Sequence, residues 1–110
     1  MNAMNRWALP LAAAALLVFS FAAYAAEPDT VTINNFAFSP AILSVAPGTK
    51  VTWTNKDEEP HTVTSADAGA TFKSAALDTN DKFSFTFDKP GTYKYFCSVH
   101  PHMIGTIVVK

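Results

Sequence analysis

Beyond residue 26, apolar and polar residues alternate in short stretches separated by turn signals, a pattern that predicts β-strands. Residues 82–87 are the clearest case, because three phenylalanines fall on one face and polar side chains on the other. Tyr93, Tyr95 and Cys97 share a face in the same way. The predicted strands are residues 30–34 (with Phe36 and Phe38 following), 42–45, 50–54, 61–64, 82–87, 92–97 and 104–109.

Turns and polar loops separate these stretches, at residues 46–48, 55–60, 67–81 and 88–91. We find no convincing helix, internal repeat or low-complexity linker. Seven or eight short strands in a chain of this length predict an all-β fold, an antiparallel sandwich with Greek-key connections. Its buried face is expected to be aromatic, formed by Trp53, Phe83, Phe85, Phe87, Tyr93 and Tyr95.

The first residues have a different composition. Arg6 is the only charged side chain before Glu27, and residues 7–26 are uncharged and rich in alanine, leucine, phenylalanine and valine. Ala23 and Ala25 then place small residues at the two positions that a signal peptidase reads. This pattern predicts a secretory signal peptide that is cleaved after Ala25.

The predicted cleavage divides the chain into a signal peptide, residues 1–25, and a single domain, residues 26–110. The domain is then exported, and we expect it in the periplasm. The alternative is an uncleaved membrane anchor, because the uncharged run is just long enough to span a bilayer. No later stretch of the sequence is expected to span a membrane.

Composition narrows the classes of function. A chain of 110 residues forms one domain at most. A net charge of −1 argues against a nucleic-acid-binding protein, which needs a basic surface. The single cysteine excludes an internal disulfide and a CxxC-type zinc or redox site, but it leaves room for one thiolate ligand. For a small exported domain without disulfides, a bound metal becomes more plausible.

One short segment gathers side chains that bind soft metals. Cys97, His100 and Met103 lie at three-residue intervals between two predicted strands, and His61 lies upstream at the start of another. A sandwich clusters its loops at two ends, so these four side chains are expected to converge. Two histidines and a cysteine in a trigonal plane, with a weak axial methionine, form a blue-copper electron-transfer site.

Each of these residues also has a structural interpretation when taken alone. Cys97 fits a small buried residue, His61 or His100 a surface residue, and Met103 ordinary core. Taken together the structural interpretation fails, because the only cysteine, a methionine and two of the three histidines fall within seven residues.

These motifs resemble the cupredoxins, the small blue copper proteins, and the short spacing from Cys97 to Met103 is most similar to that of amicyanin. The resemblance covers nearly the whole chain after the signal peptide. The segments that carry it, besides the loop from Cys97 to Met103, are residues 47–55, 60–61, 91–97 and 103–109.

The resemblance implies one type 1 copper ion with His61, Cys97 and His100 as equatorial ligands and Met103 as the axial ligand. It places the Pro60 carbonyl near the opposite axial side. It also implies that the ring edge of His100 reaches the surface and that electrons leave through it. An apolar patch is expected around that edge, with Pro60, Val99 and Pro101 as candidates.

Two positions depart from amicyanin. Amicyanin has asparagine after its first histidine ligand, whereas this chain has Thr62, and we hypothesise that the Thr62 hydroxyl bonds toward Ser98. The second departure is His102, where a less polar residue is expected. It is interpreted as an exposed histidine without a role; the alternatives are a pH-sensitive docking surface and a competing copper ligand.

The leading hypothesis is a monomeric periplasmic electron carrier, not an enzyme, that passes single electrons between redox proteins. Resemblance to amicyanin suggests an amine dehydrogenase as donor and a c-type cytochrome as acceptor. The alternatives are a periplasmic copper-binding or copper-delivery protein, and a structural sandwich with ligands present by chance. The acidic residues 57–59 are interpreted as a solvated turn, with a bias on partner choice as the alternative.

Overall fold

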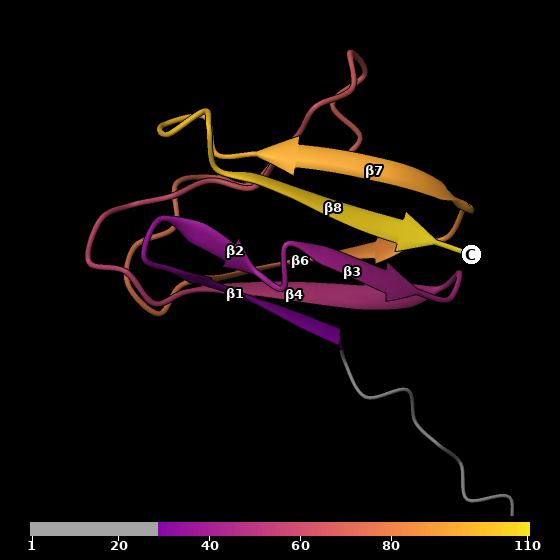
Figure 1. Ribbon diagram of the computed structural model, residues 1–110, viewed down its shortest axis with the longest axis horizontal. Helices are drawn as coiled ribbons and strands as arrows, with labels where there is room; N and C mark the ends of the chain where they lie inside the picture. The colour runs from indigo at the N-terminus through magenta and orange to yellow at the C-terminus, as the bar shows by residue number, and fades with distance from the viewer. Residues whose placement is uncertain (1–28) are drawn as a thin grey trace, which may run out of the picture.

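The computed structural model describes residues 29–110, which form two facing four-stranded sheets (Figure 1). The strand order is β2-β1-β4-β6 in one sheet and β3-β8-β7-β5 in the other. The strands are β1 Asp29–Asn34, β2 Ala37–Ser39, β3 Ile42–Val45, β4 Thr49–Asn55, β5 Thr64–Ser65, β6 Lys82–Phe87, β7 Gly91–Phe96 and β8 Ile104–Val109. The all-β sandwich is confirmed. The predicted signal peptide, residues 1–25, lies outside the described residues.

The two sheets are mixed, so the prediction of an antiparallel sandwich was wrong in this respect. β1 runs parallel to β4, with Val31 opposite Trp53, and β3 runs parallel to β8, with Leu43 opposite Ile107. The remaining strand pairs are antiparallel. After β2 the chain passes to the other sheet and enters β3, so no hairpin links β1 to β4 and they are free to align in parallel.

The core lies between the sheets and is rich in aromatic rings, as predicted. Trp53, Phe87 and Tyr95 are buried, while Phe83, Phe85 and Tyr93 are half-buried and pack against them. The long loop between β5 and β6 adds Phe72, whose ring stacks on Trp53 with centroids 5.9 Å apart. The loop is therefore part of the core and fixes one side of the sandwich.

The predicted strand at residues 61–64 is shorter than expected and begins later. β5 contains only Thr64 and Ser65, and it pairs with Phe96 and Tyr95 of β7. His61 instead forms an isolated bridge with Leu77 of the long loop, through hydrogen bonds of 3.1 and 2.7 Å between their backbones. Its backbone is thereby held by the loop between β5 and β6, and not by a sheet.

Among the residues that the structure describes, no helix is long and apolar enough to cross a membrane.

Candidate metal centre

The segment from Cys97 to Met103 is a compact loop between β7 and β8. The amide of His100 donates to the carbonyl of Cys97 at 3.2 Å, and the amide of Met103 donates to the carbonyl of His100 at 2.9 Å. The amide of Cys97 donates back to the carbonyl of Met103 at 3.1 Å. These three hydrogen bonds close the loop on itself and fix the spacing of its three candidate ligands.

Three of the four predicted ligand side chains meet at one end of the sandwich. The side-chain donor atoms of His61, Cys97 and His100 all lie within 4.8 Å of one another. The Cys97 Sγ is 3.7 Å from Nδ1 of His61 and 3.8 Å from Nδ1 of His100. His61 and Cys97 are fully buried and His100 is half-buried. Met103, the fourth, is buried and belongs to the hydrophobic core cluster.

The surroundings of Cys97 favour its thiolate form. Burial raises the pKa of the thiol. The Thr62 amide, which donates to Sγ at 3.3 Å, the neighbouring imidazoles of His61 and His100, and the Val99 amide together lower it further than burial raises it, so that the pKa falls from 9.0 to about 6. Because the thiolate is the metal-binding form of cysteine, Cys97 is prepared to act as a ligand at neutral pH.

Asp57 has a role that the sequence interpretation missed. Its Oδ2 lies 2.8 Å from Nε2 of His61, on the side of the ring away from Cys97, and its side chain is only 9% exposed. Burial raises the pKa of Asp57, but hydrogen bonds from the amides of Phe36 and Asn35 and from His61 bring it below its ordinary value. The interpretation of residues 57–59 as a solvated turn is therefore wrong for Asp57.

Phe36 is the second residue that the sequence did not single out for the site. Its ring meets His61 edge-on, with centroids 5.3 Å apart, and meets His100 in the same way at 5.0 Å. Phe36 is nevertheless 46% exposed, so part of the residue faces solvent although its ring packs against both imidazoles.

Thr62 joins the two segments that supply the ligands. Its Oγ1 accepts a hydrogen bond from the amide of Ser98 at 2.8 Å and lies 2.9 Å from the Ser98 hydroxyl. The predicted bond between Thr62 and Ser98 is confirmed. Since Thr62 follows His61 and Ser98 follows Cys97, this link fixes the distance between two candidate ligands.

A family model described as a cupredoxin-like domain matches residues 8–109. The chain belongs to the cupredoxin-like family. It is 35% identical to amicyanin-alpha of Methylorubrum extorquens over 83 residues, which is 73% of this chain and 70% of the relative. Among solved structures, a purple cupredoxin from Nitrosopumilus maritimus is 36% identical with a TM-score of 0.71, covering 74% of this chain and 99% of that one. A Cu(I) form of an amicyanin variant is 33% identical with a TM-score of 0.71, covering 80% and 88%.

The residues of this cupredoxin fit a copper ion by their donor chemistry. A soft thiolate, two imidazoles and a thioether are the donor set of blue copper sites, and hard cations prefer oxygen ligands instead. Nδ1 of both histidines faces the sulfur, while Nε2 of His61 is taken by Asp57. This division of roles between the two ring nitrogens is typical of metal-bound histidine.

The surface beside the centre of the cupredoxin is apolar in part. Val99 is 52% exposed, and Pro60 and Pro101 are also exposed. His102 is exposed next to them. The expected apolar residues around His100 are therefore at the surface, and Phe36 adds a further ring to them.

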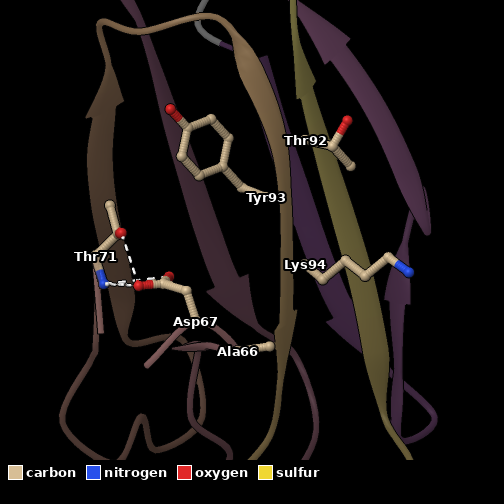
Figure 2. A pocket seen from close by; sticks show the side chains of 6 residues that line it. All are labelled: Ala66, Asp67, Thr71, Thr92, Tyr93 and Lys94. Atoms are coloured by element: carbon tan, nitrogen blue, oxygen red, sulfur yellow. Dashed lines mark hydrogen bonds between the residues drawn. The ribbon is translucent and has the colours of Figure 1, made fainter. Parts of the chain in front are cut away.

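A surface hollow of about 590 Å³ lies apart from these residues, beside the outer edge of β7 (Figure 2). Its lining consists of Ala66, Asp67, Thr71, Thr92, Tyr93 and Lys94. The Asp67 carboxylate already accepts hydrogen bonds from the amide and hydroxyl of Thr71 at 3.3 and 3.1 Å. The hollow shares no residue with the cluster around Cys97, and it offers no comparable set of ligands.

Proposed function

We propose that this protein is a blue copper electron carrier that binds one type 1 copper ion. In this proposal His61, Cys97 and His100 would be the main ligands and Met103 a weaker fourth ligand, with the Pro60 carbonyl beside the ion. The convergence of the three donor atoms within 4.8 Å, from segments 36 residues apart, is the observation that carries it.

The surrounding chain supports electron transfer because it holds the ligands rigidly. When bound, the copper supplies a one-electron couple, accepting an electron from a donor as Cu(II) and returning it to an acceptor as Cu(I). Hydrogen bonds fix His61 at its backbone and its ring, and the amides of Thr62 and Met103 fix the orientation of Cys97 and its loop. Ligands that move little between the two oxidation states favour fast transfer.

We further propose that electrons pass through the half-buried ring of His100 to redox proteins that dock on the exposed apolar residues around it. Such encounters are weak and brief. The proposed carrier is a monomeric periplasmic protein, not an enzyme, that is released by cleavage after Ala25. The likeness to amicyanin supports an amine dehydrogenase as donor and a c-type cytochrome as acceptor.

Spectra of the protein with residues 1–25 removed, recorded after addition of Cu(II), test this function. We expect an intense blue thiolate band and a narrow copper hyperfine splitting in the EPR spectrum. Cys97→Ser should abolish the band, and Met103→Leu should keep the colour while shifting the potential. A blue Cys97→Ser variant would show that the ligand assignment is wrong.

The same preparation separates an electron carrier from a copper-delivery protein. An electron carrier retains its copper through repeated cycles of reduction and oxidation in the presence of a competing chelator. A protein that delivers copper loses Cu(I) to the chelator after the first reduction, and that result would contradict our proposal.

A further inference from the structure

The carboxylate of Asp57 connects the candidate ligand His61 to a turn that is distant in the sequence. Oδ2 of Asp57 contacts Nε2 of His61 at 2.8 Å. The two oxygens of Asp57 also accept hydrogen bonds from backbone amides, Oδ1 from Asn35 at 2.7 Å and Oδ2 from Phe36 at 2.9 Å. Asp57 therefore joins the loop after β4 to the turn between β1 and β2.

That turn has a strained backbone. Asn35 and Phe36 form a two-residue hairpin between β1 and β2, with φ of 53° and 56°. A hairpin with two left-handed central residues favours asparagine first and glycine second. A phenylalanine in the second position is unfavourable because its Cβ crowds the backbone in this conformation. The two hydrogen bonds to the Asp57 carboxylate offset this strain.

Burial of Phe36 in the core does not explain why the turn adopts this strained backbone conformation. Phe36 is 46% exposed, so it buries less apolar surface than the core phenylalanines do. What the turn does achieve is the position of the ring, which packs nearly perpendicular to both His61 and His100, with interplanar angles of 89° and 83°. The rings of His61 and His100 are themselves 5.0 Å apart, so Phe36 covers the pair together.

We propose that Asp57 is a positioning residue that orients His61 for the metal and at the same time seats Phe36 as a lid over both histidines. This inference rests on the proposed copper site. By accepting the proton of Nε2, the carboxylate leaves the lone pair of Nδ1 facing Cys97. By holding the turn, it keeps the Phe36 ring between the two imidazoles and solvent.

The tautomer of His61 in the metal-free protein is the first test. Nitrogen NMR of the imidazole should show the proton on Nε2. Asp57→Asn should move it toward Nδ1, because asparagine offers one acceptor oxygen where the carboxylate offers two, and the two backbone amides of the turn compete with Nε2 for it. Glu58→Gln is the matched control, since it removes the same charge from the exposed neighbouring residue. Equal tautomer populations in all three proteins would overturn the role of Asp57.

Slow amide exchange measures the turn in the same samples. The amide protons of Asn35 and Phe36 should lose protection in Asp57→Asn and keep it in Glu58→Gln. Unchanged protection in Asp57→Asn would show that the carboxylate does not hold the turn, and it would refute the link to Phe36.

Copper measurements then test the effect on the centre. Asp57→Asn should weaken Cu(II) binding about 10- to 100-fold, as loss of a partner to a ligating histidine does. A negative charge favours Cu(II) over Cu(I), so the reduction potential should rise, by about 59 mV if the Cu(II) affinity falls tenfold more than the Cu(I) affinity. An equal rise of the reduction potential in Glu58→Gln would show that the loss of any nearby negative charge has this effect, and it would contradict a specific role for Asp57.

Phe36→Ala tests the lid separately. It should speed the loss of copper to a chelator without moving the His61 tautomer. Ile42→Ala is its control, because Ile42 is an exposed apolar residue of β3, 68% exposed, in the other sheet. Equal rates of copper loss in the two variants would refute the lid. If the unaltered protein shows no thiolate band with copper, the proposed function fails, whereas the metal-free NMR results still decide the role of Asp57.

Discussion

Replacing Thr62 with valine measures how strongly the two ligand-bearing segments are joined. The Thr62 hydroxyl accepts from the amide of Ser98 at 2.8 Å, and it lies 3.0 Å from the hydroxyl of Thr64. Valine keeps the branched shape of the side chain and replaces the hydroxyl with a methyl group. The change therefore breaks the link between the segments of His61 and Cys97 while leaving no cavity.

The expected cost follows from the number of bonds and their exposure. A typical hydrogen bond contributes about 0.5–1.5 kcal/mol net, and a buried group left unpaired costs about 1–3 kcal/mol. Thr62 is buried but Ser98 is exposed, so water replaces part of what the Ser98 amide loses. We expect Thr62→Val to lower the free energy of unfolding by about 1–2 kcal/mol. For a domain of this size the melting temperature then falls by roughly 4–16 °C.

Urea unfolding of the metal-free protein is the assay, with Thr62→Ser and Thr52→Val as comparisons. Thr62→Ser retains the hydroxyl and should recover most of the stability. The hydroxyl of Thr52 makes a 2.7 Å hydrogen bond to that of Ser84, but the bond is exposed to solvent, so Thr52→Val should cost little. If Thr62→Val costs no more than Thr52→Val, the hydroxyl does not join the two segments and the reasoning is refuted.

Three further predictions concern other positions. Asn55→Ala should destabilise the protein by about 3 kcal/mol in urea, since the buried Asn55 side chain bonds the backbones of Asp57, Glu59 and Leu77; a cost below that of Thr62→Val would contradict this. Gly105→Ala should cost about 1–3 kcal/mol, because its Cβ would collide with the buried Tyr95 ring; an unchanged urea midpoint would show that the ring moves aside freely. The pKa of Cys97 falls from 9.0 to about 6 on folding, so the unfolded chain binds more protons between these values. The contribution of Cys97 to the stability of the metal-free protein should then rise from pH 6 to pH 9 and be flat below pH 6, and Cys97→Ser should remove this dependence.

The fold class could be predicted from the sequence because it depends on local periodicity. The alternation in residues 82–87 corresponds to β6, in which Phe87 is buried while Lys82, Ser84 and Thr86 are exposed. The pairing of β1 with β4 could not be predicted in the same way. Parallel pairing depends on the path of the chain between the sheets, which no local pattern of residues encodes.

The residues of the candidate metal centre show the same difference between what a local motif predicts and what only the folded chain reveals. Cys97, His100 and Met103 were found because their chemistry is concentrated in one loop. Asp57 was not found, because residues 57–59 are all acidic and only the folded chain determines which of them faces His61. Phe36 was grouped with the strand residues, since nothing in its type indicates a left-handed turn.

The loop between β4 and β5 does more to prepare the centre than the number of its ligands suggests. It supplies one candidate ligand, His61, yet Asp57 and Thr62 of this loop bond to the β1–β2 turn and to the loop of Cys97, and Asn55 at the end of β4 bonds to the long loop. Each bond ends on a backbone amide or carbonyl, so the contact persists whatever side chain stands at the other end. The loop from Cys97 to Met103 has three candidate ligands but closes mainly on its own backbone. We infer that changes in the upstream loop displace His61 relative to Cys97, whereas side-chain changes between Cys97 and Met103 act mainly on the ligand that they replace.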